Sequence, residues 1–361
     1  DYLLSTEKFS LFEMENRISK VCVTGGAGYI GSWLVKKLLS RGYAVHATLR
    51  NLGDASKVGL LKSFPGAEAR LVLFEADIYK PSEFEQAIKG CDFVFHVATP
   101  FQHYENSKKL NFLGGKQYRN VTEAAVAGAK SIVMSCISSG CVKKLIYTAS
   151  VVAASPLKDD GFSFKDFMDE TCWTPLDAPY PYHGVSFLKD YTDSKTLVEK
   201  EILKYGRGEN DGFEVVTLAC GLVGGDGLLS SMSTSQSMFV SQLANNEFMF
   251  RSTRFLEELL AKVPIIHIDD VCEAHIFCME ETSIKGRFLC ASSYVATADI
   301  ASYYQEKYPE FHVMPEYVIE VKRETKWGAT KLNEMGFKYK YGMEMTLDDC
   351  VKYARRMGLL Q

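Results

Sequence analysis

One segment near the start of the chain constrains its fold more than any other. Residues 21–24 (Val, Cys, Val, Thr) run directly into three glycines spaced every third residue, Gly25, Gly28 and Gly31. From Ile30 onward, apolar residues recur at the three- and four-residue spacing of a helix that packs on a sheet. The segment therefore predicts a buried strand that ends at the glycines, a tight loop and then an amphipathic helix.

The three glycines have separate physical roles in such a loop. Gly25 permits the tight turn, Gly28 lets backbone amides approach a pyrophosphate, and Gly31 lets the helix lie close to the strand. The helix N-terminus, with Tyr29 and Ile30 in its first turn, then faces the phosphates, where exposed amides and the helix dipole favour negative charge. A chain with 27 glycines also produces plain glycine turns by chance, but the flanking strand and helix favour a dinucleotide site.

Composition and charge narrow the class of partner. The chain has 361 residues, of which 47% are hydrophobic, enough for a sizeable core in one large domain or two. Its net charge is −4, from 41 basic and 45 acidic residues, and no basic block stands out. We therefore expect a small-molecule partner and no binding to nucleic acid.

The ten cysteines predict buried free thiols of a reducing compartment, because they are scattered, form no Cys-x-x-Cys pair and mostly lie in apolar runs. We predict no metal site. The first twenty residues mix charged with apolar side chains, and no run of about 18 apolar residues is present, so we expect no signal peptide and no membrane span. These features predict a cytoplasmic protein, and we expect a monomer or a weak dimer.

Apolar strand patterns alternate with helical ones over the first 220 residues. This alternation predicts an α/β protein with a Rossmann-type, doubly wound parallel sheet. Beyond residue 221 the pattern loosens, which predicts a smaller, interleaved C-terminal substrate lobe. The predicted division is an N-terminal extension at 1–17, a nucleotide-binding domain at 18–220 with 263–283 returning to it, and a lobe from 221–262 and 284–361. Strands are predicted at 43–49, 71–74, 91–97, 142–149, 213–219 and 263–268, and helices at 30–39, 81–90, 117–136 and 191–204.

The choice of cofactor depends on the end of the second strand. An acidic residue stands about 20 residues beyond the glycines in NAD-binding versions of this fold, and this chain has Arg50 there. A guanidinium can pair with a 2′-phosphate, and Lys57 can add a second charge, so we predict NADPH/NADP+. A solvated surface role for Arg50, with Asp54 in an NAD-type role, is the alternative.

Two further residues follow the third strand. Asp77 and Ile78 are suited to contact the adenine, as a carboxylate near its amino group and an apolar neighbour. Asp77 can equally cap the helix that begins near Pro81.

The pattern Tyr-x-x-x-Lys occurs three times, so context must select among the copies. Only Tyr191/Lys195 lies downstream of a buried strand ending at Ser150 and begins a convincing helix. A spacing of four places the phenol and the ammonium on one face of that helix. The other copies are Tyr104/Lys108 and Tyr303/Lys307.

These residues predict proton transfer coupled to hydride transfer. Lys195 is expected to lower the pKa of Tyr191 and to hold the nicotinamide ribose, and Ser150 to orient a substrate oxygen. Residues 97–100 would bring backbone against the nicotinamide, through Val97, Ala98 and Thr99. His96 lies in the apolar strand and is predicted to be a core histidine. Singly, Ser150 is a turn hydroxyl and Tyr191 a half-buried aromatic; together with the glycine loop they predict a catalytic set.

These segments, with residues 267–276 (His-Ile-Asp-Asp-Val-Cys-Glu-Ala-His-Ile), resemble the extended short-chain dehydrogenase/reductases. The closer resemblance is to the plant branch that contains dihydroflavonol reductase, anthocyanidin reductase, vestitone reductase and cinnamoyl-CoA reductase. It runs from about residue 20 to the C-terminus. The resemblance implies an NADPH site at the three glycines, Arg50, Lys57 and Asp77, and a catalytic role for Ser150, Tyr191 and Lys195.

The chain departs from that branch around the substrate. Dihydroflavonol reductases carry an Asn five residues after the catalytic Ser, where this chain has Ser155. Members of the branch usually have a proline after the sixth strand, where this chain has Cys220. The tracts 101–116 and 159–184 and the sequence before Lys195 also differ. We expect an aromatic, flavonoid-like ketone or aldehyde as substrate. The candidate pocket residues are Phe101, Ser155, Tyr180, Tyr182 and Gly221, with ordinary loop packing as the alternative.

Two other functions compete with carbonyl reduction. One is the reduction of a charged flavonoid heterocycle, as the resemblance to anthocyanidin reductase implies. The other is a non-catalytic protein that senses NADPH, although such proteins typically lose the Tyr and Lys that this chain keeps.

Overall fold

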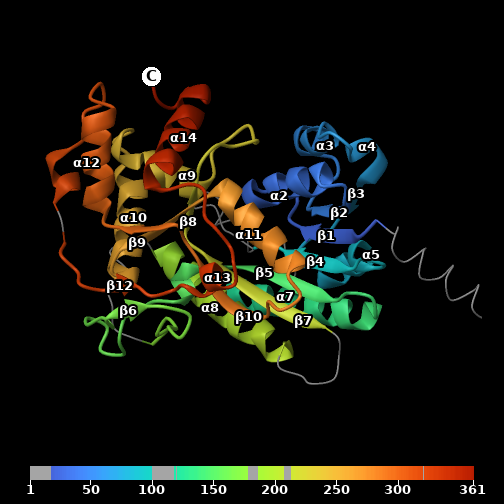
Figure 1. The fold of residues 1–361 in the computed structure, drawn as a ribbon. Helices are drawn as coiled ribbons and strands as arrows, with labels where there is room; N and C mark the ends of the chain where they lie inside the picture. Colours follow the sequence, from blue (N-terminus) through green and yellow to red (C-terminus); the bar gives the residue numbers. More distant parts are fainter. Residues whose placement is uncertain (1–17, 100–117, 119, 178–185, 207–212, 320) are drawn as a thin grey trace, which may run out of the picture.

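The structure, a computed structural model, describes residues 18–99, 118, 120–177, 186–206, 213–319 and 321–361. At its centre is a seven-stranded sheet with the order β10-β7-β5-β4-β1-β2-β3, in which neighbouring strands run parallel (Figure 1). This confirms the predicted doubly wound α/β fold. The strands are β1 (Lys20–Thr24), β2 (Ala44–Leu49), β3 (Leu71–Glu75), β4 (Phe93–His96), β5 (Lys144–Ser150), β7 (Glu214–Cys220) and β10 (Gly286–Cys290).

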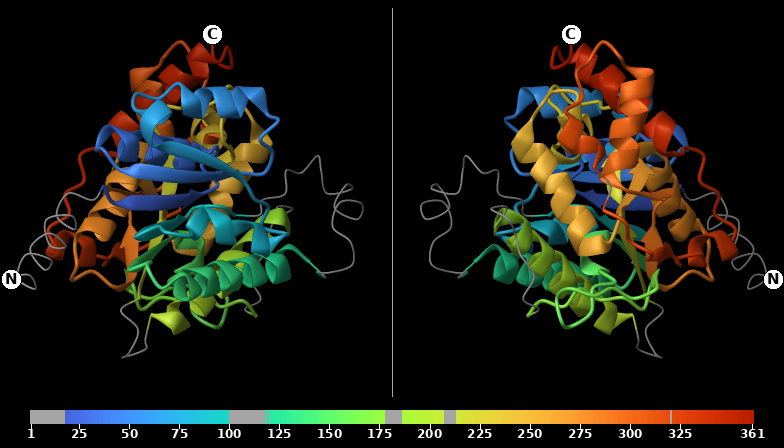
Figure 2. Two further views of the ribbon diagram at one scale, coloured as in Figure 1. Left: turned by 90° about the vertical axis from the view of Figure 1, so that its right-hand side faces the viewer. Right: turned by 90° about the vertical axis from the view of Figure 1, so that its left-hand side faces the viewer.

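Successive strand residues point to opposite faces of this sheet and belong to two different buried clusters. Both faces are therefore apolar, and helices cover each of them. Val94 and Leu145 belong to one cluster, and Phe95 and Ile146 to the other. Helices α5 (Phe84–Ile88), α7 (Val121–Ser139) and α8 (Ser186–Tyr205) pack on the first face, and α2 (Tyr29–Ser40) and α11 (Ile268–Glu280) pack on the second (Figure 2). The short helices α3 (Ala55–Lys62) and α4 (Ala67–Arg70) follow β2.

Helix α7 begins at Val121, because the Asn120 side chain accepts the Glu123 N–H at 2.8 Å and caps the helix. Within the described ranges it is the one helix long and apolar enough to cross a membrane by length and composition. Its buried side packs against α8 and the sheet, as in the core helix of a globular domain.

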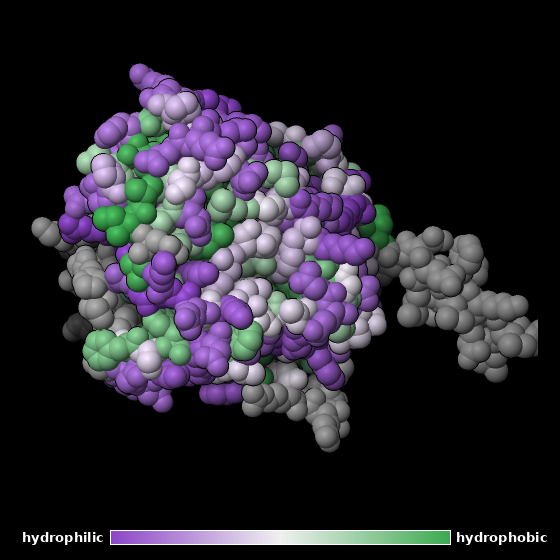
Figure 3. Space-filling model, turned by 60° about the vertical axis from the view of Figure 1, so that its left-hand side comes forward, coloured by the Kyte–Doolittle hydropathy of each residue, from purple (hydrophilic) through white to green (hydrophobic). Residues whose placement is uncertain are grey.

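A second group of elements lies beyond the carboxyl ends of the central strands. The strands β8 (Leu222–Gly224), β9 (Val263–His267) and β11 (Ser293–Val295) form a three-stranded sheet, and β6 (Phe167–Met168) pairs with β12 (Lys326–Trp327). Hydrophilic residues cover much of the face of the molecule in Figure 3, with smaller hydrophobic patches between them. The surrounding helices are α9 (Thr234–Phe239), α10 (Glu247–Leu260), α12 (Thr297–Lys307) and α14 (Met343–Arg356), whereas α13 (Lys331–Glu334) packs against β10 of the central sheet.

Two strands differ from the sequence prediction. The strand predicted at 263–268 does not return to the central sheet; as β9 it pairs with β8 and β11. The central sheet instead gains β10, from a segment predicted to belong to the lobe, and pairs it with β7. Both strands are only five residues long, so local pattern could not distinguish which sheet each one joins. The division at 220/221 stays a prediction.

The cysteines agree with their sequence pattern. All ten are free thiols, and nine of them are buried, with Cys141 partly exposed. Burial raises the pKa of thiols such as Cys278 to about 12, so they are protonated and chemically quiet at neutral pH.

Candidate active site

The glycine loop adopts the predicted geometry. Gly25 has a φ of +69°, in the left-handed region that favours glycine, and its N–H donates to the Thr48 hydroxyl at 3.1 Å. A Cβ on Gly31 would lie 2.2 Å from the Gly25 carbonyl oxygen, so only glycine allows α2 to approach the loop this closely. The Gly28 N–H closes the turn onto the same carbonyl at 3.0 Å.

The start of helix α2 at Tyr29 leaves backbone N–H groups available to a ligand. Gly28 is its N-cap residue and has no side chain with which to cap the first amides, and the first turn holds no acidic residue. Its first N–H groups therefore have no side-chain cap among the described residues, at an end where the helix dipole favours an anion. This is the donor set that a pyrophosphate requires.

The hydroxyl of Thr24, at the end of β1, organises the loop after β4. It accepts the N–H groups of Val97 and Ala98, each at 3.1 Å, and lies 2.9 Å from Nδ1 of His96. Burial lowers the pKa of His96 to about 3, which keeps the imidazole neutral at physiological pH. His96 is thus buried in the strand, as its apolar surroundings predicted. Thr24 was missed at the sequence level, where a strand-end hydroxyl carries little signal.

Ser150 and Tyr191 meet at the carboxyl end of β5. Ser150 is the last residue of that strand, and its hydroxyl is hydrogen-bonded to the phenol of Tyr191 in α8. Burial raises the pKa of Tyr191 to about 12. This differs from the expectation that Lys195 lowers it, because desolvation of the phenolate dominates in this structure. The phenol therefore holds its proton at neutral pH.

Lys195 lies one turn further along α8 and is almost fully buried. Its Nζ donates to the Thr99 hydroxyl at 2.8 Å, to the Thr148 carbonyl at 2.9 Å and to the Tyr147 hydroxyl at 3.4 Å. It lies 6.0 Å from the centre of the Tyr191 ring. Desolvation lowers the pKa of Lys195 to about 8. The three partners fix the ammonium between the β4 loop and the end of β5.

Arg50 and Lys57 differ in their surroundings. Arg50 directly follows β2 and is exposed. Lys57 lies in α3, with Nζ 3.3 Å from a carboxylate oxygen of Asp54. Asp54 also caps α3 by accepting the Lys57 N–H at 3.2 Å. The carboxylate of Asp54 is therefore engaged with Lys57.

Asp77 and Ile78 lie in the turn after β3. The carboxylate of Asp77 accepts the Tyr79 N–H at 3.1 Å, so it stabilises that turn. The helical turn that begins at Pro81 has Lys80 at its N-cap and no side-chain cap, which contradicts the alternative in which Asp77 caps it. Ile78 is buried against Gly128 of α7.

The candidate substrate residues are only partly described. Phe101, Tyr180 and Tyr182 lie outside the described residues. Ser155 is fully buried, with its hydroxyl donating to the Leu259 carbonyl, so this hydroxyl is engaged in the fold. Gly221 is buried where a Cβ would lie 2.7 Å from the Pro264 carbonyl oxygen.

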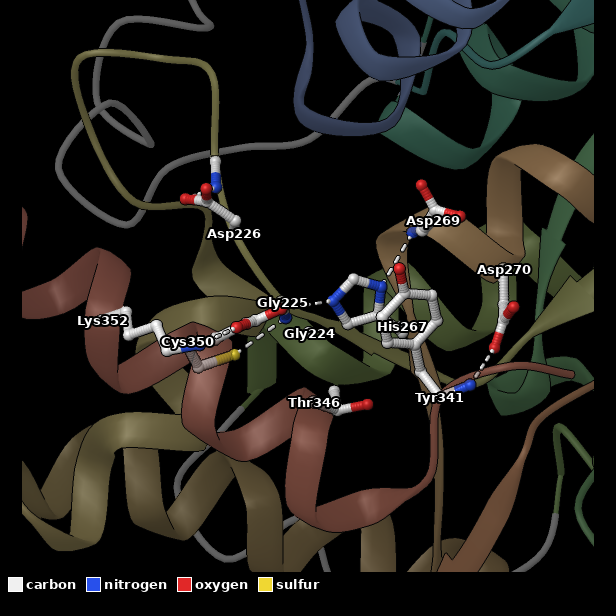
Figure 4. A network of polar contacts seen from close by, with 12 residues as sticks. Gly224, Gly225, Asp226, His267, Asp269, Asp270, Tyr341, Thr346, Cys350 and Lys352 are labelled. Atoms are coloured by element: carbon white, nitrogen blue, oxygen red, sulfur yellow. Dashed lines mark hydrogen bonds and ion pairs between the residues drawn. The ribbon is translucent and has the colours of Figure 1, made fainter.

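Contacts beside the glycine loop connect it to the second group of elements. The Tyr29 hydroxyl donates to the Gly224 carbonyl at the end of β8, at 3.0 Å. Next to it, the imidazole of His267 packs against Gly225 and stacks on Tyr341, with ring centres 4.0 Å apart (Figure 4). Gly225 has a φ of +105°, and a Cβ there would lie 2.4 Å from Nε2 of His267. The loop and β8 are therefore held in a fixed relation.

Comparison with known proteins identifies the family. A model described as the NAD dependent epimerase/dehydratase family matches residues 21–291. The chain belongs to this family. Together with its similarity to proteins named as reductases, this makes it an NAD(P)-dependent oxidoreductase of the extended short-chain dehydrogenase/reductase type. Among the described residues, no group of three or more His, Cys, Asp or Glu side chains is placed to hold a metal ion.

Several relatives are similar over nearly the whole chain. A putative anthocyanidin reductase of Ginkgo biloba is 32% identical over 341 residues, covering 94% of this chain and 95% of the relative. The dihydroflavonol 4-reductase of Gerbera hybrida is 32% identical over 348 residues, covering 96% and 88%. Noscapine synthase SDR1 of Papaver somniferum is 35% identical over 361 residues, covering 98% of both chains.

Solved structures agree with this family. Vestitone reductase from alfalfa superposes with a TM-score of 0.74 at 31% identity, covering 94% of this chain and 99% of that structure. Yeast Gre2, complexed with NADPH, gives a TM-score of 0.72 at 20% identity, covering 94% of this chain and 100% of that structure. At that identity, the likeness to Gre2 bears on the fold alone.

Proposed function

We propose that this protein is an NADPH-dependent reductase that delivers hydride to the carbonyl carbon of an aromatic, phenolic ketone or aldehyde, with Tyr191 as proton donor. A single observation carries the proposal: the Tyr191 phenol is hydrogen-bonded to Ser150, with the buried ammonium of Lys195 one turn along the same helix. This set stands at the carboxyl end of a parallel strand, where sheets of this type place their ligands.

The described residues are suited to the nicotinamide cofactor. The close contact between Gly31 and Gly25, and the start of α2 without a side-chain cap, provide a cradle for a pyrophosphate. We infer that the Arg50 guanidinium pairs with the 2′-phosphate. We also infer that Lys195 exchanges its longest contact, to the Tyr147 hydroxyl at 3.4 Å, for the nicotinamide ribose. When bound, the cofactor supplies the hydride.

The chain itself supplies orientation and the proton. Ser150 donates a hydrogen bond to the substrate oxygen, which directs that oxygen toward the Tyr191 hydroxyl. Because the pKa of Tyr191 is raised, the phenol stays protonated until the carbonyl oxygen gains negative charge. The nearby Lys195 cation then stabilises the phenolate left behind.

Reduction of a flavonoid heterocycle is the second candidate. It is favoured by the similarity to proteins named anthocyanidin reductase. The same phenol and ammonium would serve it, with hydride delivered to a charged ring in place of a carbonyl. Product analysis on cyanidin and on dihydroquercetin separates the two. We propose that the protein works in the cytoplasm, because its thiols are free and buried. We also propose a monomer or weak dimer.

The test is NADPH oxidation by the purified protein against dihydroflavonols, anthocyanidins, cinnamoyl-CoA and aromatic aldehydes. We expect Tyr191→Phe to lower the turnover number about 100- to 10,000-fold, the range for loss of a positioned acid. Tyr205→Phe is the matched control, since its hydroxyl lies on the same helix and donates to Glu201 at 3.5 Å, away from Ser150 and Lys195. Full activity in Tyr191→Phe would refute the proton donor, and tight NADPH binding without any turnover would favour a sensor.

A further inference from the structure

A cavity of about 750 Å³ lies apart from the candidate active site. It is lined by the segment before β9, the start of β11 and the stretch that enters β12; the labels of β9 and β12 lie near one another in Figure 1. None of the candidate cofactor, catalytic or substrate residues among those described lines it. Its volume is in the range of small-molecule sites, so it is large enough for a ligand of its own.

Positive charge dominates the lining. Lys262, Arg323 and Lys326 line the cavity together with one carboxylate, Glu324. Outside the lining, Glu257 and Glu258 also act electrostatically on Arg323, but Glu257 is itself paired with Arg254. Glu258 offsets part of the positive charge, but the three cations of the lining still outnumber the carboxylates Glu324 and Glu258, so the cavity favours an anion.

The Arg323 side chain is held in place by an aromatic ring. Its guanidinium lies over the ring of Phe164, 4.6 Å from the ring centre. Its Nε is buried and makes no hydrogen bond to any described residue. Burial lowers the pKa of Arg323, a sign that the charge is partly desolvated. Nε itself is closed to the cavity, so a ligand carboxylate would pair with the part of the guanidinium that lines it.

The aromatic part of the lining is rigid. The ring centres of Tyr294 and Trp327 lie 5.6 Å apart. The Tyr294 hydroxyl donates to the Leu260 carbonyl, and Trp327 pairs with Met168 through the β6–β12 ladder. Two fixed rings beside a cationic group favour a planar aromatic ligand, because stacking then costs little conformational entropy.

We propose that this cavity is a second ligand site, for a small aromatic acid whose ring packs against Tyr294 and Trp327 and whose carboxylate pairs with Arg323 and Lys262. The site is separate from the Tyr191 centre and independent of the proposed reductase activity.

The test is titration of the full chain with 4-hydroxybenzoate, followed by tryptophan fluorescence and by calorimetry. The chain has three tryptophans, so a signal lost in Trp327→Phe locates the probe. We expect saturable binding that Arg323→Gln weakens at least about tenfold, the loss of one charge-assisted pair. Lys322→Gln, an exposed neighbour that does not line the cavity, is the matched control and should bind normally.

The neutral analogue 4-hydroxybenzamide should bind at least about tenfold more weakly, and Tyr191→Phe should bind the acid normally. Lys262→Gln should also weaken binding, which covers the case in which Arg323→Gln does not fold. Absence of binding, equal binding of the amide, or loss of binding in Tyr191→Phe would overturn the proposal. If inorganic phosphate bound as tightly as 4-hydroxybenzoate, the claim that the site recognises an aromatic ring would be overturned.

Discussion

Arg287 of β10 and Glu199 of α8 form a buried ion pair, with Nε 3.0 Å from Oε1 and side-chain exposures of 7% and 0%. The same guanidinium donates to the carbonyl oxygens of Ala153, Glu170 and Cys172. Glu199 lies one helical turn beyond Lys195, and Ala153 three residues beyond Ser150. One side chain therefore ties together the two segments that carry the candidate catalytic residues.

We predict that Arg287→Met destabilises the protein by about 3–5 kcal/mol, because it leaves the buried Glu199 carboxylate without its cation. Chemical denaturation gives the free energy of unfolding. The double variant Arg287→Met/Glu199→Leu should lose less than the sum of the two single changes, since it leaves no unpaired charge. Additive losses would contradict a coupled pair.

A second prediction concerns the glycine loop. In Gly31→Ala the new methyl group would lie 2.2 Å from the Gly25 carbonyl oxygen, so α2 must move away from the loop. NADPH binding should fall at least about tenfold, because the amides at the start of α2 move with the helix. Gly59→Ala in α3 is the control, since its Cβ meets nothing within 4 Å. Unchanged NADPH affinity in Gly31→Ala would contradict the cradle.

The parts of the site that are local in sequence could be predicted. The turn at Gly25, the approach at Gly31 and the Tyr191/Lys195 face of one helix each depend on spacings of a few residues. Spacing of that kind fixes geometry through backbone constraints alone.

The parts made across long sequence separations could not be predicted. The Arg287–Glu199 pair joins residues 88 positions apart, and nothing near either residue names its partner. For the same reason the pattern predicts that 286–290 belongs to the lobe, whereas β10 pairs with β7, and it cannot predict the contact of the Ser155 hydroxyl with Leu259. Burial likewise depends on tertiary packing, so the raised pKa of Tyr191 was missed.

The third prediction tests cofactor choice. Arg50→Ala should weaken the binding of NADPH by about 1–3 kcal/mol and leave the binding of NADH nearly unchanged, because only NADPH carries the 2′-phosphate. Lys57→Ala should have a smaller effect, since Asp54 lies 3.3 Å from that ammonium and offsets its charge. Dissociation constants for both cofactors from fluorescence titration check this. An equal loss of affinity for both cofactors would show that Arg50 does not contact the 2′-phosphate.

The fourth prediction concerns the buried charge of Lys195. Desolvation lowers its pKa from 10.5 to about 8, so the folded state disfavours the ammonium relative to the unfolded chain. The cost is fully present below pH 8 and fades as pH rises toward 10.5, where the unfolded chain also loses the proton. At neutral pH the cost is on the order of 3 kcal/mol.

Lys195→Met should therefore abolish reductase activity and yet melt no lower than the native protein at neutral pH. Its stability advantage should shrink between pH 8 and 10.5, because the native protein is relieved of its buried charge over that interval. Denaturation at several pH values checks the trend, with Lys204→Met, an exposed lysine of the same helix, as the control. If Lys195→Met were less stable at pH 7, the hydrogen bonds to Thr99 and Thr148 would outweigh the burial of the charge.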